Sequence, residues 1–313
     1  MNGAAGGATD RLRTRLTDWK VIAHALGMLV VVLYILEFLN RGEWHNDAYG
    51  FWIAWNGGLY DIPWLDHWAY VYSPAFAHGI APLISLPWDV FWMIWMLFQF
   101  AALLLIVGPA WAGVILLLPW PSLPGYANSV PSTIYNGNPQ LLIALAIAAG
   151  LRWPAAWAVP ILTKVTPGIG VLWFAVRREW RRLGIALGAT ALIVAVSAIF
   201  SLDLWRQWIG LLADSADANT LAKEPILPLP LLVRLPVATA VLVWGALTDR
   251  YWTVPIAATL ALPAIQLGGF AILVAAIPFL GLPLTPRWPL PRRASDESAP
   301  AQEPMAPAAS RSA

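Results

Sequence analysis

The sequence has no cysteine and little charge, and each shortage excludes a class of protein. With no cysteine among its 313 residues, the chain holds neither a disulfide framework nor a thiolate metal site. Charged residues make up 12% of the positions and the formal net charge is +2, whereas an ordinary soluble domain carries about 25% charged residues. The chain therefore lacks the side chains for a water-facing exterior, and it has no basic excess that would indicate a nucleic-acid binder.

Long apolar runs take the place of the missing charge. Hydrophobic residues make up 59% of the chain, and many runs are long enough to cross a hydrocarbon layer of about 30 Å as helices. In lipid the backbone must satisfy its own polar groups, and the runs lack the alternation of barrel strands. Many of the 20 tryptophans stand beside a proline or a charge, as is typical of membrane interfaces. The sequence predicts an all-α fold, a multi-pass transmembrane helical bundle of about ten helices or half-helices.

The charges at the two ends predict that both termini lie in the cytoplasm. Four cations in the segment 1–20 precede the first apolar run, Val21 to Leu39, and the positive-inside rule keeps them in the cytoplasm. They are Arg11, Arg13, Arg15 and Lys20. A cleaved signal peptide is the alternative, but the run is long for one and no small-residue cleavage site follows it. Residues 285–313, rich in Pro, Ala and Ser, predict a disordered cytoplasmic tail.

The membrane domain, 21–284, is predicted to present polar segments on its outer face. These outer loops lie near 40–73, 121–137 and 201–227. Pro74 to Pro87 is short and interrupted by proline, so we expect it to lie in the interface or to enter the membrane only partway. The remaining apolar runs are interpreted as crossings, and they cover 88–107, 110–120, 138–151, 183–200, 229–247, 253–265 and 268–282.

The run from Pro154 to Val176 has cations at both ends, Arg152 on one side and the basic cluster 177–182 on the other. Both ends therefore favour the cytoplasm. Two half-helices of about 15 Å each, meeting near Lys164 to Gly168, satisfy this pattern, because Pro167 and Gly168 favour a break. One kinked span is the alternative. The basic cluster itself is interpreted as a topology anchor only.

Lys164 is an ionisable side chain inside an apolar stretch. Such residues are costly in a membrane and indicate function, here pairing with an anion that reaches in from the lipid. A polyprenyl phosphate fits that description. The alternatives are that the side chain extends to the surface or binds a carbonyl oxygen.

The first outer segment combines carboxylates with aromatic rings, as in Glu43-Trp44-His45-Asn46-Asp47 and Leu59-Tyr60-Asp61. A carboxylate just outside the membrane among such rings is suited to act as a general base on a sugar hydroxyl. The alternative is a solvated or helix-capping acid. His45 and His67 are weak candidates for metal ligands, because their spacing matches no known motif. Farther on, Gly137 is expected to mark a turn and Asn138 to cap the helix that follows.

These segments together resemble a known family. Asp47, Phe51-Trp52, Ala54, Leu59-Tyr60 and Tyr72-Ser73-Pro74 resemble the first outer loop of the polytopic glycosyltransferase family 87. Gly137-Asn138 resembles that family's helix start. Lys164-Val165-Thr166-Pro167 with the basic end at Arg177-Arg178 resembles its Lys-x-Thr-Pro segment. Order and spacing agree from Asp47 to Arg182.

The resemblance implies a GT-C type membrane fold in a bacterial plasma membrane. It also implies transfer of a sugar, mannose or arabinose in the actinobacterial members, from a polyprenyl-phosphate donor to a glycolipid or cell-wall glycan on the outer face. Asp47 is the implied general base and Lys164 the implied ligand of the donor phosphate, with no metal or cofactor required. The implied substrate-binding residues are Tyr49, Trp52, Tyr60, Tyr72, Asn138 and Thr166.

Two other functions are alternatives to transfer. The chain is shorter than usual members of the family, so a non-catalytic carrier of lipid-linked sugars, or an accessory membrane subunit, is the alternative hypothesis. An ion-coupled transporter would be expected to carry paired acids inside its spans. The predicted spans contain almost none beyond Glu37, which argues against a transporter.

Overall fold

The computed structural model describes residues 18–41, 47–64, 66, 68–117, 129–214 and 229–288, and all regular structure in these ranges is helical. The prediction of an all-α membrane bundle is therefore confirmed. The elements, in chain order, are α2 Trp19–Arg41, α3 Asp47–Gly57, α4 Pro74–Ile84, α5 Trp88–Leu117, α6 Ser129–Asn136, α7 Gln140–Gly150, the 3-10 helix η1 Pro154–Trp157, α8 Ala158–Lys164, η2 Thr166–Val171, α9 Leu172–Val176, α10 Trp180–Asp214, α11 Leu231–Thr248, α12 Thr253–Leu260 and η3 Leu267–Phe279.

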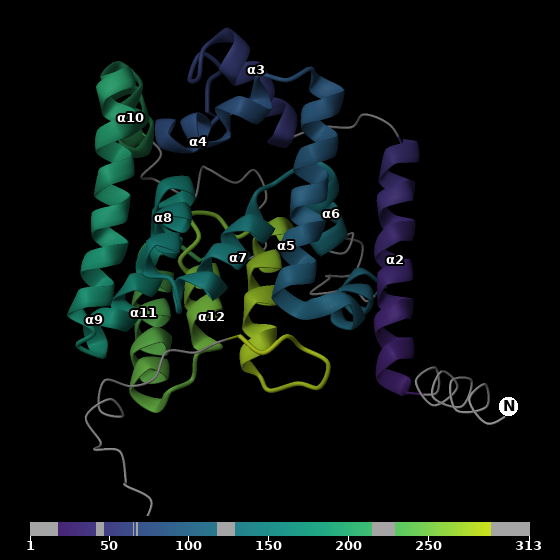
Figure 1. The fold of residues 1–313 in the computed structure, drawn as a ribbon. Helices are drawn as coiled ribbons and strands as arrows, with labels where there is room; N and C mark the ends of the chain where they lie inside the picture. The colour runs from purple at the N-terminus through teal and green to yellow at the C-terminus, as the bar shows by residue number, and fades with distance from the viewer. Residues whose placement is uncertain are drawn as a thin grey trace, which may run out of the picture.

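Four of these helices, α2, α5, α10 and α11, are long and apolar enough to cross a membrane. Their outer faces expose large apolar side chains, such as Leu192, Ile199 and Phe200 on α10 at 65%, 79% and 81% of their areas. So many exposed apolar side chains would be unfavourable in water and are expected against lipid. Figure 1 shows the long helices running side by side, with α3 and α4 across one end of the bundle.

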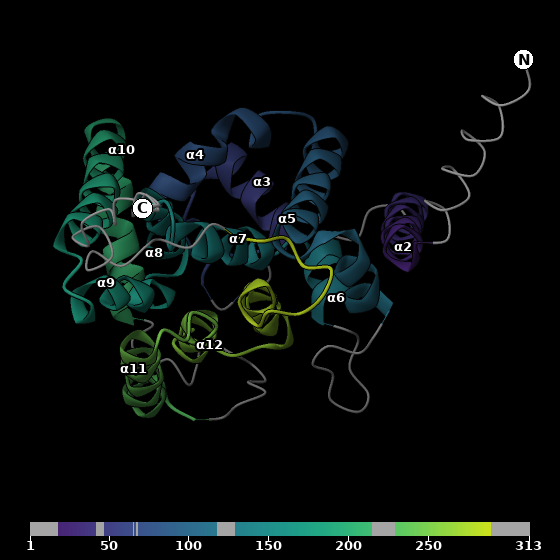
Figure 2. The same ribbon diagram turned by 60° about the horizontal axis from the view of Figure 1, so that its bottom comes forward.

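Shorter helices fill the interior of the bundle. α7, with 11 residues, and α12, with 8, bury most of their side chains, and each is too short to cross about 30 Å of hydrocarbon. The runs 138–151 and 253–265 thus form short helices rather than full crossings, and 268–282 contains the 13-residue 3-10 helix η3, which is not among the four helices long enough to cross. Figure 2 shows α7 near the centre, surrounded by the longer helices.

Helix α5 is interrupted at Gly108, whose φ of +78° suits a residue without a side chain. The following segment packs along α2, where a Cβ atom on Gly27 would collide with the backbone of Pro109. This close approach of small residues is typical of packed membrane helices. The structure describes the run 110–120 only as far as Leu117. The segment from the break at Gly108 to Leu117 is too short to cross a membrane as a separate helix.

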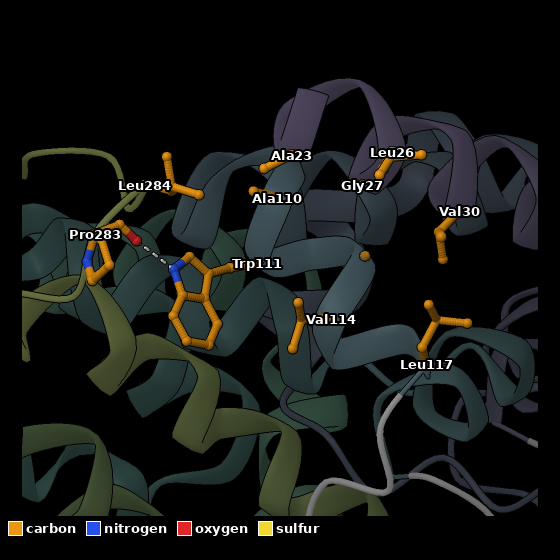
Figure 3. A pocket seen from close by; sticks show the side chains of 11 residues that line it. Ala23, Leu26, Gly27, Val30, Ala110, Trp111, Val114, Leu117, Pro283 and Leu284 are labelled. Atoms are coloured by element: carbon orange, nitrogen blue, oxygen red, sulfur yellow. Dashed lines mark hydrogen bonds between the residues drawn. The ribbon is translucent and has the colours of Figure 1, made fainter. Parts of the chain in front are cut away.

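An apolar cavity of about 330 Å³ lies beside this crossing, between α2, α5 and the chain near Pro283 (Figure 3). Trp111 closes one side by donating its indole N–H to the carbonyl of Pro283 at 2.7 Å. Because Ala23 and Pro283 line the same cavity, the beginning of α2 and the end of the described chain lie at one end of the bundle. Figure 1 places α3 and α4 at the opposite end. This arrangement supports the expectation that both termini share one side.

The segment from Pro154 to Val176 folds as a hairpin with its break at Val165. A Cβ atom on Gly168 would collide with Ile161, and one on Gly170 with Trp157, so the two arms pack against each other in antiparallel order. The hairpin predicted from the flanking cations is confirmed, and the alternative of one kinked span is wrong.

Arg177 shows that the basic cluster does more than anchor the topology. Its largely buried guanidinium forms ion pairs with Glu179 at 2.8 Å and with Asp249, and it lies 5.5 Å from the ring centre of Trp173. It therefore clamps the end of the hairpin to the turn after α11. The interpretation of the cluster as an anchor only is wrong for this residue.

Three outer segments contain helices that the sequence did not predict, and one of these helices is α6, which lies within 121–137. α3 lies within 40–73, and α10 continues as helix past a non-helical residue, Ser201, to Asp214. Expectations that fall on residues before Asp18, on 42–46, 65, 67, 118–128 and 215–228, or on the tail after Trp288 lie outside the described residues.

Candidate active site

Asp47 and Asn138 form the first element of the site. Asp47 is the first residue of α3, and Asn138 precedes α7. The Asn138 side-chain amide donates a hydrogen bond from Nδ2 to Oδ2 of Asp47 at 2.8 Å. The expectation that Asn138 caps α7 is wrong, because Pro139 occupies that position and no side chain caps the helix. Asn138 instead orients a carboxylate 91 residues away in sequence.

Gly137 allows this contact. Its φ is +73°, and a Cβ atom at this position would collide with the side chain of Ala48 in α3. Its carbonyl oxygen accepts a hydrogen bond from the indole of Trp95 at 2.7 Å. A larger residue would be strained in this backbone conformation and would push the turn away from α3. Gly137 therefore brings Asn138 within hydrogen-bond distance of Asp47.

Lys164 approaches the same place from the hairpin. It is the last residue of α8, and Val165 after it has φ 54° and ψ −68°. These angles are those of a strained γ-turn and are rare for a β-branched residue. The Lys164 ammonium lies 5.5 Å from the ring centre of Tyr72, near enough to Asp47 for their charges to interact. Strained backbone of this kind is found preferentially at functional sites.

The surroundings of Asp47 alter its proton affinity. Burial raises the pKa of the Asp47 carboxyl above its ordinary value, while the hydrogen bond from Asn138 and the positive charge of Lys164 act in the opposite direction. Asp47 and its neighbours lie outside the four membrane-spanning helices. A carboxylate with a raised pKa is a stronger proton acceptor than an ordinary aspartate.

Lys164 and Tyr72 line a cavity of about 340 Å³, which lies in the size range of small-ligand sites. Polar and aromatic side chains share its wall with apolar ones. The lining consists of Trp64, Val71, Tyr72, Thr163, Lys164, Val165, Thr166, Trp208, Leu211, Leu212, Leu231, Pro263, Ala264 and Gln266. Aromatic faces and hydroxyl or amide groups of this kind suit a sugar, and the single ammonium suits an anion.

A second cavity, of about 600 Å³, is almost wholly apolar and shares Thr163 with the first. Its wall comes from α4, α5, α7, α8 and α10, with residues such as Phe76, Phe98, Leu142 and Val159. The two cavities thus place an apolar volume beside a polar one that holds a cation. This pairing suits an amphiphilic ligand with an anionic head.

The sequence matches the description "Glycosyltransferase family 87" over residues 70–277, more than half of the chain. The chain belongs to glycosyltransferase family 87. No curated protein and no solved structure matches it. Membership makes the protein a membrane glycosyltransferase and favours enzyme over carrier. Tyr72, Asn138 and Lys164 fall inside the matched range, whereas Asp47 precedes it.

The structure brings together most of the side chains that the resemblance to family 87 singled out. Tyr60 donates its hydroxyl to the carbonyl of Tyr72 at 2.7 Å, and Thr166 lines the polar cavity with Lys164. Tyr49 and Trp52 instead join Trp88 in an aromatic cluster, in which the Tyr49 ring lies 6.0 Å from Trp52 and 5.1 Å from Trp88. Tyr49 and Trp52 therefore pack α3 against the start of α5, and neither lines the polar cavity.

Three residues of the polar cavity, Trp64, Trp208 and Gln266, were not predicted from the sequence as site residues. Trp64 belongs to the aromatic outer segment, and Gln266 is a polar residue between two apolar runs, so both carried a signal. Trp208 carried no such signal, because it reaches the cavity only through the continuation of α10 as a helix after Ser201.

A metal site was the weaker prediction for the outer histidines. The described residues contain no group of three or more metal-ligating side chains. His45 and His67, the two histidines considered as ligands, lie outside the described residues.

Proposed function

We propose that this family 87 enzyme transfers a sugar, with mannose favoured and arabinose as the second candidate, from a polyprenyl-phosphate donor to a glycolipid or cell-wall glycan. The reaction is placed on the outer face of a bacterial plasma membrane. The observation that carries the proposal is that Asp47 and Lys164, from segments more than a hundred residues apart in sequence, lie close enough for their charges to interact, with Lys164 in the wall of a polar cavity.

Asp47 is proposed as the general base. Asn138 holds one carboxylate oxygen by a hydrogen bond to Oδ2, which leaves the other oxygen to accept the proton of an acceptor hydroxyl. Burial raises the pKa of Asp47, and a base becomes more effective as its pKa approaches the working pH. A fixed, oriented carboxylate also reduces the entropy cost of reaching the reactive geometry.

Lys164 is proposed to bind the donor phosphate. Lys164 lines the polar cavity and its charge interacts with that of Asp47, so an anionic group in the cavity would gain a charge-assisted hydrogen bond from its ammonium. The sugar would then lie against Tyr72 and Trp208, and the polyprenyl chain would enter the apolar cavity on the far side of Thr163. No metal is needed in this arrangement, because the ammonium neutralises the phosphate.

The proposed reaction is a single displacement. Asp47 accepts the proton of the acceptor hydroxyl as its oxygen forms a bond to the anomeric carbon. The bond from that carbon to the phosphate oxygen breaks, and the lipid phosphate leaves with the electron pair beside Lys164. One displacement inverts the configuration at the anomeric carbon, so the stereochemistry of the product tests the proposal.

The experiment uses the purified full chain in lipid nanodiscs with radiolabelled polyprenyl-phosphate mannose and, separately, polyprenyl-phosphate arabinose. Asp47→Asn is expected to keep donor binding and to lose transfer by about 10²–10⁴-fold, the usual contribution of a general base. Lys164→Met is expected to weaken donor binding. Asp66→Asn, which changes an exposed acid of the same outer segment, serves as the matched control and is expected to keep full activity.

Two results would overturn the proposal. Undiminished turnover by Asp47→Asn would remove the proposed base. Wild-type protein that transfers neither sugar, with glycolipid or glycan acceptors present, would remove polyprenyl-phosphate sugars of these two kinds as donors.

A further inference from the structure

His78 joins helices α4 and α10. It lies in α4, and its ring contacts two serines of α10: Nδ1 is 2.9 Å from Oγ of Ser197, and Nε2 is 3.4 Å from Oγ of Ser201. Ser197 is buried, with 4% of its area exposed. A polar network at this depth between two helices fixes their relative position, because its groups have no water to replace lost partners.

The hydrogen bonds of this network are mutually consistent for one form of the histidine. Ser201 donates its proton to the carbonyl of Ser197 at 3.0 Å, so its oxygen accepts from Nε2–H of His78. Nδ1 then carries no proton and accepts from the hydroxyl of Ser197. Burial lowers the pKa of His78, which agrees with a neutral ring. The pattern assigns the Nε2–H tautomer.

Ser197 connects His78 to two tryptophans of α10, the second of which lines the cavity. Its hydroxyl oxygen accepts the indole N–H of Trp205 at 3.0 Å, and the Trp205 ring meets that of Trp208 edge to face with 5.4 Å between centroids. Trp208 donates its own indole N–H to the carbonyl of Val71 at 3.3 Å. Val71 and Trp208 both line the cavity that holds Lys164.

This chain of contacts spans the point where α10 changes direction. Ser201 has non-helical angles, φ −157° and ψ 53°, so the segment that carries Trp205 and Trp208 is not held by a continuous helix. Its position depends on side-chain contacts on both sides of the break. His78 makes those contacts from α4, through Ser197 before the break and Ser201 at it.

We propose that His78 is a positioning residue that holds the end of α10 so that Trp208 forms the wall of the cavity opposite Lys164. His78 itself touches no substrate. The inference rests on the proposed function in one respect: the ligand that Trp208 contacts is the sugar-phosphate head of the donor. A displaced Trp208 would weaken donor binding more than it slows the chemical step.

The experiment compares His78→Leu, which removes both hydrogen bonds, with His78→Asn, whose side-chain oxygen can accept from Ser197 as Nδ1 does. With radiolabelled polyprenyl-phosphate mannose, or the arabinose donor if that is the active one, His78→Leu is expected to raise KM about 5–10-fold with kcat changed less than 2-fold. His78→Asn is expected to recover most of the wild-type KM. His24→Leu, at a histidine of α2 that bonds only its own helix, is the control.

A double-mutant cycle tests whether His78 acts through Trp208. If it does, Trp208→Leu raises KM by a similar factor, and adding His78→Leu to it produces little further change. Multiplicative effects of the two substitutions would overturn the proposal. So would equal KM values for His78→Leu and wild type, or equal losses in His78→Leu and His78→Asn.

A second readout does not depend on transfer. Because the chain has no cysteine, Leu211→Cys places a single thiol in the cavity wall beyond Trp208. His78→Leu is expected to change its rate of alkylation by a water-soluble maleimide at least 3-fold, and His78→Asn to leave the rate near that of Leu211→Cys alone. An unchanged rate in His78→Leu overturns the positioning role even if the proposed donor is wrong. A changed rate without donor turnover supports it while removing the proposed function.

Discussion

Gly137 lies so close to Ala48 that a Cβ atom at position 137 would collide with the alanine side chain. The turn before α7 therefore reaches α3 only because residue 137 has no side chain. Through this contact Asn138 meets Asp47 at 2.8 Å. The geometry of the proposed base thus depends on a glycine that takes no part in chemistry.

Gly137→Ala is therefore expected to lower sugar transfer. The substitution adds a methyl group where both the positive φ and the space are unfavourable, so the turn must move and the bond from Asn138 to Asp47 lengthens. A displacement of this kind commonly costs about 10²-fold in rate. Gly57→Ala, at a glycine of α3 with open space around it, is the control. Equal turnover by the two variants would show that the turn does not position the base.

The pH dependence of transfer is expected to report the state of Asp47. The base works only when deprotonated, so kcat/KM falls as the pH falls through its pKa. Because burial raises that pKa above the ordinary value of 3.8, the acid limb should lie at higher pH than for an exposed aspartate. Removing the charge in Lys164→Met removes an influence that lowers the pKa, so the limb should move to still higher pH.

Asn138→Leu is a second variant that is expected to raise the pKa of Asp47. It removes a hydrogen bond that lowers the pKa of Asp47, so its acid limb should also move upward, whereas Asp66→Asn should leave the limb in place. A limb that moves downward in both Lys164→Met and Asn138→Leu would contradict the assignment of Asp47 as the titrating group.

The crossing of α2 and α5 is expected to tolerate no side chain at Gly27. Gly27→Ala would press a methyl group onto the backbone of Pro109, and overpacking of this kind costs about 1–3 kcal/mol. The expected result is a lower thermal midpoint in detergent, measured by the loss of monodisperse protein. Gly188→Ala, at a position of α10 with nothing within 4 Å, should leave the midpoint unchanged. A stable Gly27→Ala would show that α2 is not held at this crossing.

Arg177 is expected to stabilise the end of the hairpin that carries Lys164. Arg177→Ala removes the 2.8 Å ion pair with Glu179 and the ion pair with Asp249, while Arg182 stays 3.1 Å from Glu179 and limits the loss. Breaking a buried ion pair costs about 3–5 kcal/mol, and the 40% exposure of the Asp249 side chain reduces this toward the lower end. Arg206→Ala, which removes an exposed ion pair, should cost less than about 1 kcal/mol. Thermal unfolding midpoints in one detergent compare the two, and equal midpoints would contradict the clamp.

The class of the protein and the hairpin followed from the sequence because each depends on local composition. Long apolar runs with little charge require helices in lipid, and cations at both ends of 154–176 cannot be satisfied by one crossing. The lengths of the inner helices could not be predicted in this way. Apolar content does not distinguish a crossing from a short buried helix such as α7 or α12, because both are apolar on every side.

Part of the candidate site could also be predicted from local sequence. Lys164 stands out as a charge in an apolar run, and Asp47 was found by resemblance to family 87. The bond between Asn138 and Asp47 was missed because helix capping gave a sufficient local explanation for Asn138. His78 and Trp208 carried no signal, since their roles arise from contacts of α10 with α4 and with Val71 before it, across more than a hundred residues.

The most direct test of the account asks whether residues 47 and 164 meet at the donor site in a membrane. In the cysteine-free chain, Asp47→Cys combined with Lys164→Cys is treated in native membranes with a short bifunctional thiol reagent, and Asp47→Cys combined with Arg177→Cys is the control pair. The account predicts a cross-link in the first pair alone. No cross-link in the first pair, or an equal cross-link in the control pair, would contradict a shared site for the base and the phosphate.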